Sequence, residues 1–140
     1  MTCYCDFEQP EFYHREQRTA RVAHKCSECH SAIRPGERYE HVRGKWEGDV
    51  GTFETCCRCL ALREWVTGHV PCSCWAHGNM REDVLADAEN WRSQAPGLWF
   101  GALRREVLIR RARKNDLETR ERQTHPPASR ERGTSEGAKP

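Results

Sequence analysis

Apolar residues recur with two different spacings along the chain, and the change divides it into an extended part and a helical part. Residues 37–43 and 52–56 are runs typical of strands, and the glycine-rich residues 44–49 between them favour a turn. Residues 60–69 place side chains at positions i, i+3, i+4 and i+7, namely Leu62, Trp65, Val66 and His69. The middle of the chain is therefore predicted to form a β-hairpin followed by a helix.

The C-terminal half is predicted to form two helices. Asn79 followed by Glu82 fits a capping box, and a helix is expected to about residue 93, with an apolar stripe of Val84, Leu85, Ala88 and Trp91. After a break at 95–97, residues 98–118 predict a second helix, with an apolar face of Trp99, Phe100, Leu103, Val107 and Leu108. The short break favours an antiparallel pair. From about residue 119 no large apolar residue occurs, so residues 119–140 are expected to be a disordered tail.

Two C-x2-C pairs give the chain its clearest chemistry. Cys26 and Cys29 form the first pair, and Cys56 and Cys59 form the second after a gap of 26 residues. Such pairs wrap tight turns that bring two sulfurs to one metal ion, and four thiolates are typical of a structural zinc site. No secretory leader is recognised, so we expect a reducing compartment, where thiols stay reduced or bind metal.

The order of the predicted elements indicates the fold class. A knuckle carrying the first pair, a hairpin, and a helix whose first turn carries the second pair form a small α+β fold stapled by zinc. This order resembles treble-clef zinc fingers, and residues 33–39, Ile-Arg-Pro-Gly-Glu-Arg-Tyr, resemble the stretch after the first pair in several such fingers. The expected finger spans residues 24–69.

A wider resemblance covers about residues 3–110. The stretch Cys3-Tyr4-Cys5-Asp6, the finger, and residues 71–78 together resemble a group of small uncharacterised proteins encoded by tailed phages and prophages. The resemblance implies a metal-binding accessory protein of a phage-infected bacterial cell. It implies no reaction.

Two C-x-C clips suggest a second zinc ion per chain. Cys3 and Cys5 open the chain, and Cys72 and Cys74 follow the finger helix. A metal held by these four cysteines would tie the N-terminal arm to the segment after the helix. Mixed sites using His69 or His77, and cysteines without metal, stay open as alternatives. Of the nine cysteines, Cys57 is then left over as a buried filler or an exposed thiol.

Length and composition set the organisation. We expect a zinc-binding domain at 1–78, a two-helix extension at 79–118 and the tail. Residues before 18 are expected to form an arm that docks its aromatic rings on the finger, and residues 18–25 a short strand. Hydrophobic residues make up only 36% of the 140, so metal must supplement a small core. No apolar run approaches the roughly 20 residues that span a bilayer, and a cytoplasmic protein is expected.

Charge is uneven and suggests how the protein functions. Residues 1–96 have a net charge of −3, and residues 97–140 have +5. The second helix carries the basic cluster Arg104, Arg105, Arg110, Arg111, Arg113 and Lys114. We expect a binding module for a protein or a nucleic acid, with these residues and Trp46 as candidate contacts. Trp46 could equally fold back over the finger.

Two other functions fit parts of this sequence. An inhibitor of a host defence or transcription protein would suit a phage setting and needs no active site. A metal-dependent nuclease would need side chains such as His41 and His69 around an open metal, whereas all-cysteine sites are closed. The sequence therefore favours a protein that is not an enzyme, with no membrane or small-molecule partner.

Overall fold

The computed structural model describes residues 8–125. Cys3 and Cys5, and the expected tail beyond residue 125, lie outside this range. The elements in chain order are β1 (Phe12–Thr19), β2 (His24–Lys25), β3 (Ala32–Ile33), β4 (Arg38–Trp46), β5 (Asp49–Cys56), α1 (Cys57–His69), α2 (Met80–Gln94) and α3 (Pro96–Thr124). The small α+β class is confirmed.

The main sheet has the strand order β1-β4-β5, and every neighbouring pair is antiparallel. The predicted hairpin is present, but its turn is shorter than expected. Strand pairing continues to Trp46 and Asp49, so only Glu47 and Gly48 turn, with φ of 49° and 87°. Two residues with positive φ match the twist of the flanking strands.

The extended arm expected before residue 18 is a regular strand over its described part, and its Tyr13 ring docks on Trp46 at 6.2 Å, as expected. β1 pairs along its whole length with β4, from Phe12 opposite Lys45 to Thr19 opposite Arg38. The predicted strand over 18–25 is likewise replaced by the end of β1 and the separate β2. β1 is an edge strand with almost no buried side chain. It therefore lacks the alternating pattern by which strands are recognised.

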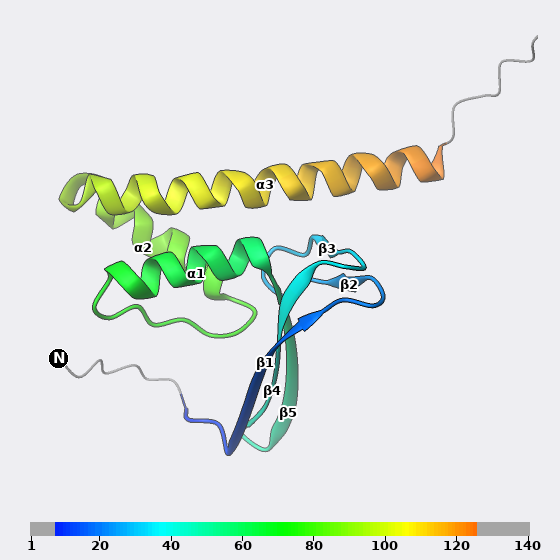
Figure 1. The fold of residues 1–140 in the computed structure, drawn as a ribbon. Helices are drawn as coiled ribbons and strands as arrows, with labels where there is room; N and C mark the ends of the chain where they lie inside the picture. Colours follow the sequence, from blue (N-terminus) through cyan, green and yellow to red (C-terminus); the bar gives the residue numbers. More distant parts are fainter. Residues whose placement is uncertain (1–7, 126–140) are drawn as a thin grey trace, which may run out of the picture.

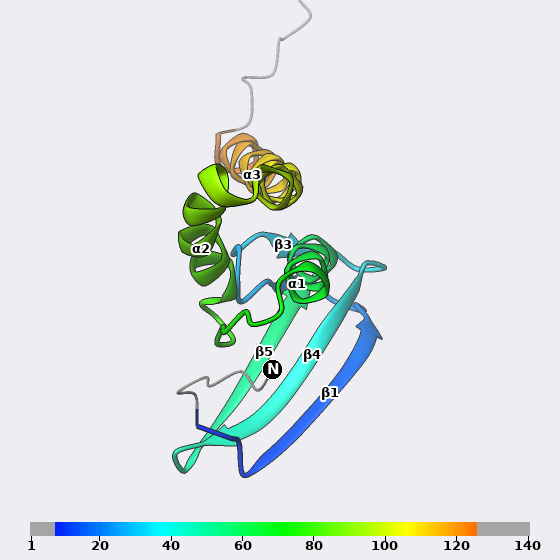
Figure 2. The same cartoon turned by 90° about the vertical axis from the view of Figure 1, so that its left-hand side faces the viewer.

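α1 packs on the main sheet, and α2 and α3 pack on α1 and on each other. α1 lies between the sheet and α3, and α3 runs alongside it in the opposite direction (Figures 1 and 2). A buried ion pair fastens α1 to the sheet, because Arg63 donates to both oxygens of Glu40 at 2.8 and 2.5 Å. Ala95 alone separates α2 from α3, and Pro96 occupies the first turn of α3, where its missing N–H costs nothing.

α3 differs from its prediction in length and in its buried face. It continues to Thr124, so the prediction that the helix ends at residue 118 and a disordered tail begins at residue 119 is wrong. Its buried residues are Gly101, Ala102, Glu106 and Ile109, whereas the predicted face includes Phe100, Val107 and Leu108, which are exposed. Small residues allow close packing on α1, where a Cβ on Gly101 would overlap the Trp65 ring. The α2 stripe is confirmed by buried Val84 and Ala88.

Candidate metal centre

Four cysteines from three elements meet beneath α1. Cys26 and Cys29 come from the knuckle between β2 and β3, Cys56 ends β5, and Cys59 lies in the first turn of α1. All four are at most 2% exposed. Their sulfurs all lie within 4.8 Å of one another, and those of Cys29 and Cys56 are 3.8 Å apart. The predicted ligand set of the first site therefore comes together.

The backbone of the knuckle positions its two sulfurs. Cys26 N–H donates to Ser31 O, and His30 N–H donates to Cys26 O, both at 3.0 Å. His30 has a φ of 61°, which reverses the chain directly after Cys29. The N–H of Cys56 donates to Cys26 Sγ at 3.4 Å and links the two pairs. Such N–H donors stabilise a thiolate.

The electrostatics of the cluster favour a cation. Hydrogen bonds with neighbouring thiols, Cys26 foremost, lower the pKa of Cys29 and raise the pKa values of Cys56 and Cys59. Buried thiolates this close repel one another, so only some sulfurs can ionise unaided. A divalent ion removes the repulsion and binds all four as thiolates.

Zinc fits the donor set and its dimensions. Zn–S bonds of about 2.3 Å in a tetrahedron place the sulfurs about 3.8 Å apart, which is the distance between Cys29 and Cys56. Four buried thiolates complete the tetrahedron and leave no position for water or substrate. One four-cysteine metal site, suited to zinc, is therefore present in the described residues.

Cys57 stays outside this site. It is exposed, while its neighbour Cys56 is buried among the ligands. The cluster therefore contains the member of the adjacent pair that the x2 spacing to Cys59 predicts. Of the two alternatives for Cys57, the exposed thiol is confirmed and the buried filler is wrong.

The described residues include only two of the four cysteines predicted for the second site. Cys72 and Cys74 have Sγ atoms 3.9 Å apart, and both cysteines are disulfide-bonded in the structure. Their predicted co-ligands, Cys3 and Cys5, are not among the described residues. The histidines considered as substitutes are engaged elsewhere, since His69 Nδ1 contacts Trp65 O at 2.7 Å and His77 Nε2 contacts the Tyr13 hydroxyl at 2.9 Å.

Sequence reasoning missed Glu28, which connects the knuckle to α2. Its buried carboxylate accepts from the backbone N–H groups of Gly78 at 2.7 Å and Arg81 at 3.4 Å. It thereby caps the start of α2, whereas the predicted cap, Asn79, makes no side-chain capping bond. A glutamate between two ligand cysteines gives no sequence signal for a cap 50 residues away.

Two carboxylates of α3 also hold the arrangement together. Asp116 accepts from the N–H of Ala32 in the knuckle at 2.7 Å, and from Arg34 at 3.3 Å. Glu106 is fully buried and is held by Arg81 of α2 and Arg110 of α3. The long helix is thus anchored both to the metal-binding knuckle and to α2.

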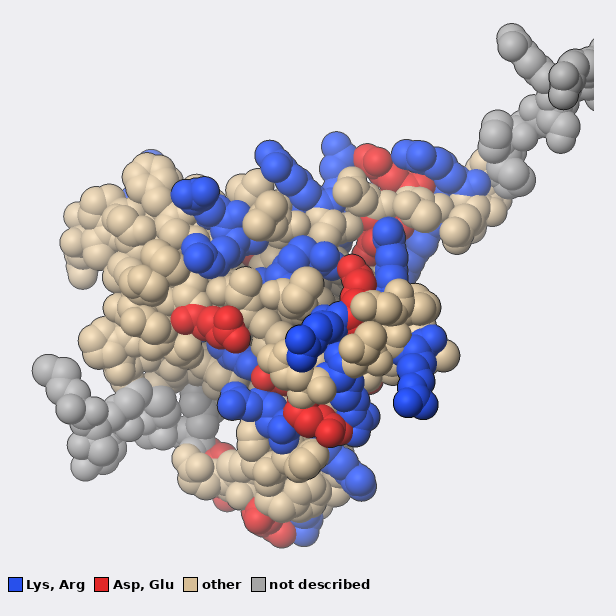
Figure 3. Space-filling model, viewed as in Figure 1, with Lys and Arg blue, Asp and Glu red and all other residues tan. Residues whose placement is uncertain are grey.

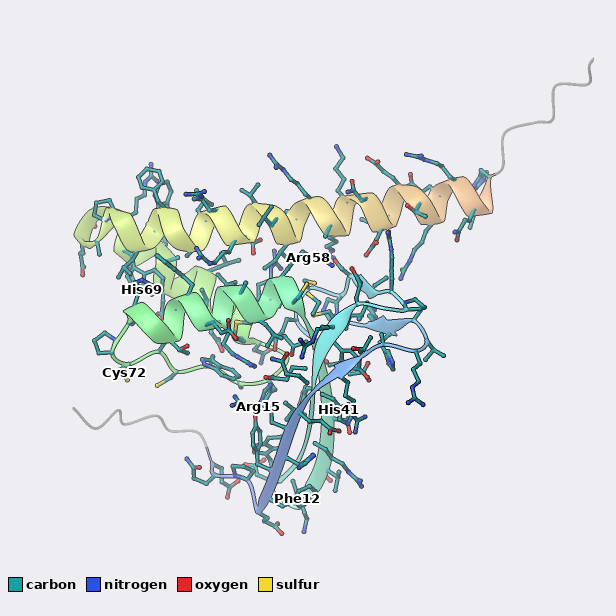
Figure 4. The ribbon with its side chains drawn as sticks, viewed as in Figure 1. Phe12, Arg15, His41, Arg58, His69 and Cys72 are labelled. Atoms are coloured by element: carbon teal, nitrogen blue, oxygen red, sulfur yellow. The ribbon has the colours of Figure 1, made fainter. Side chains whose placement is uncertain are left out.

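The histidines of the nuclease hypothesis do not meet. His41 lies on β4 near Glu54, with a separation of 3.8 Å, and His69 lies at the far end of α1 (Figure 4). Within residues 8–125, the four-cysteine cluster is the one group of side chains placed to hold a metal ion. Neither histidine therefore belongs, within the described residues, to a group of side chains that could hold a second metal ion.

The predicted partner-binding residues divide into different environments. Arg105 stacks over the Trp65 ring at 4.1 Å, Arg110 pairs with Glu106, and Lys114 lies 3.8 Å from Glu118. Arg104, Arg111 and Arg113 are exposed and form no ion pair with any residue of the described range. Trp46 is half-buried over Gly44 and Gly51, as its alternative interpretation predicted.

Comparison with known proteins gives no relative from which a role could be transferred. No family model matches the chain, and no curated protein or solved structure is significantly similar to it. Nor does any helix in residues 8–125 have the length and apolar character needed to cross a membrane. The metal centre consequently rests on its own geometry.

Proposed function

We propose that this protein is a non-catalytic binding module of treble-clef type, in which zinc holds the fold and α3 binds single-stranded nucleic acid. The observation that carries the proposal is the outer face of α3, defined here as Phe100, Arg104, Val107, Leu108 and Arg111. These residues lie at helical spacing, and all are exposed. The intramolecular core uses the opposite face of the helix.

The zinc site supports a structural role because it is closed and buried. A core this small depends on the metal, since structural zinc supplies about 10–16 kcal/mol of apparent binding energy coupled to folding. Its ligands join the knuckle, β5 and α1, and α3 packs directly on α1. The metal therefore fixes the surface that presents α3.

The outer face combines the two contacts that single strands need. Phe100 is 57% exposed and offers a ring on which a base can stack. Arg104 and Arg111 border the same groove, of about 820 Å³, between α1 and α3. Lys and Arg side chains continue along α3 in Figure 3. The apolar side chains can therefore contact the bases of a single strand, while the neighbouring guanidinium groups contact its phosphates.

The test is a titration of the full chain with fluorescent single-stranded and duplex oligonucleotides at several salt concentrations. The variant Arg104→Gln/Arg111→Gln should reduce the slope of log K against log salt by about 1.4 for single strands, since each phosphate contact contributes about 0.7. Arg38→Gln/Arg43→Gln on β4 is the charge-matched control and should leave the slope unchanged.

Equal binding by wild type and the α3 variant would overturn the proposal. Retention of a host protein by the outer face, with no nucleic acid, would instead favour the inhibitor of a host defence or transcription protein. The prediction of a phage-encoded accessory protein is compatible with either partner.

We also infer a second zinc ion, held by Cys3, Cys5, Cys72 and Cys74. Both cysteines are disulfide-bonded in the structure, so this second ion requires their reduction to thiolates. The separation of 3.9 Å between Cys72 and Cys74 Sγ is close to that of two ligands on one zinc ion. Elemental analysis should find two zinc ions per chain and one in the Cys72→Ser/Cys74→Ser variant. One ion in wild type, with disulfides revealed by thiol titration after unfolding, would refute this second site.

A further inference from the structure

An aromatic box lies at the turn end of the sheet, far from the outer face of α3. It is formed by one ring from each strand of the main sheet and two from the segment between α1 and α2, namely Tyr13, Trp46, Phe53, Trp75 and His77. The His77 ring stacks on Tyr13 and on Phe53, with centroid distances of 5.8 and 5.1 Å. Trp46 and Trp75 meet it edge-on at 6.3 and 5.0 Å.

Two glycines create the floor for this arrangement. Gly44 and Gly51 are directly opposite each other on β4 and β5. A Cβ on Gly44 would lie 2.5 Å from the Trp46 ring, so a side chain there would displace the tryptophan. The two paired glycines thus make room for the Trp46 ring, which meets the rings of Tyr13 and Phe53 almost at right angles, at 83° and 79°.

The box opens into a pocket of about 690 Å³ with a distinctive charge. Among the described residues, its lining includes the carboxylates of Glu8, Glu47 and Asp49 but no lysine or arginine. Glu47 lies in the hairpin turn and Asp49 directly follows the turn, and both are exposed. Arg63 of α1, outside this lining, lies over the Trp75 ring at 5.1 Å. The pocket itself pairs the other aromatic rings, whose faces are negative, with formal negative charge.

We propose that this pocket binds an arginine or lysine side chain from a basic segment of a protein partner. A cation over tryptophan or tyrosine is attracted by the ring quadrupole, and carboxylates at the rim add attraction and steering. The same charge repels phosphate, so the pocket is unsuited to nucleic acid. Outside the four-cysteine site, no cluster of possible metal ligands occurs in residues 8–125, so a bare metal ion has no comparable site there.

The probe is a capped tri-arginine peptide, titrated into the full zinc-loaded chain by calorimetry at low salt. The matched tri-citrulline peptide has nearly the same shape without charge and should bind at least about tenfold more weakly. Glu47→Gln/Asp49→Asn should weaken tri-arginine binding about three- to tenfold. Glu64→Gln/Glu82→Gln, exposed carboxylates on α1 and α2, are the control and should leave it unchanged.

Two results would overturn the proposal. One is equal affinity for the charged and uncharged peptides, and the other is equal weakening by the two carboxylate variants, which would indicate diffuse charge attraction only. NMR shifts of the Trp46 and Trp75 indole signals locate the peptide directly. Because Arg104→Gln/Arg111→Gln should not alter peptide binding, failure here is distinguishable from failure of nucleic-acid binding.

Discussion

Glu106 offers a sharp test of how α3 is held in place. Its carboxylate has 0% exposure, accepts from Arg81 Nε at 2.9 Å, and accepts from Arg110 Nε at 2.8 Å. Replacing Glu106 with Met leaves the Arg81 guanidinium, whose side chain is 16% exposed, without its anion. Removing one partner of a buried pair costs about 3–5 kcal/mol.

The two arginines should couple to Glu106 unequally. Arg110 is 65% exposed, so water screens its pair and its coupling should be at most about 1 kcal/mol. Arg81→Met combined with Glu106→Met removes both buried charges, and the double variant should regain most of the lost stability. The coupling energy between Arg81 and Glu106 is therefore expected to be about 2 kcal/mol or more.

Urea denaturation at a fixed free zinc concentration, followed by circular dichroism, measures these free energies of unfolding. Arg111→Met replaces an exposed arginine of α3 that forms no ion pair within residues 8–125, and as the control it should change stability by less than about 0.5 kcal/mol. If Glu106→Met alone is as stable as wild type, the buried carboxylate is not what anchors α3.

Three further outcomes are expected. Cys57→Ser should keep full zinc content and fold normally, whereas Cys56→Ser should lose the metal and the near-ultraviolet circular dichroism signal; the reverse pattern would exchange the ligand assignment. Gly101→Ala should lower the free energy of unfolding in urea by about 1–3 kcal/mol, because its Cβ would enter the Trp65 ring. Burial lowers the pKa of His77 to about 4. The neutral ring therefore contributes to the free energy of unfolding above pH 6.5, and this contribution is lost as the pH falls toward 4. An NMR titration midpoint near 6.5 would show that the ring is solvated.

The metal site was the most predictable part because its chemistry is local in sequence. The C-x2-C spacing predicted the four cysteines that form the buried cluster and separated Cys56 from Cys57, since a tight turn sets the reach of each pair. The hairpin and α1 followed from periodicity in the same way. These features depend on neighbouring residues, so one sequence suffices to recognise them.

Features that depend on distant partners were missed. β1 carries polar side chains on both faces and is a strand only because β4 pairs with it. The buried face of α3 contains Glu106, which a hydrophobic pattern excludes unless Arg81 is known to lie opposite. Glu28 likewise caps α2 through the tertiary fold. In each case the deciding interaction joins residues that the sequence does not place together.

One buried zinc ion with four thiolate ligands is expected to hold this fold together. Zinc-edge X-ray absorption on the Cys72→Ser/Cys74→Ser variant isolates this site from any second ion. The expected result is four sulfur ligands at about 2.3 Å, with loss of helical circular dichroism when a chelator removes the metal. A folded protein that contains no zinc, or whose zinc has an oxygen or nitrogen ligand, would contradict the account.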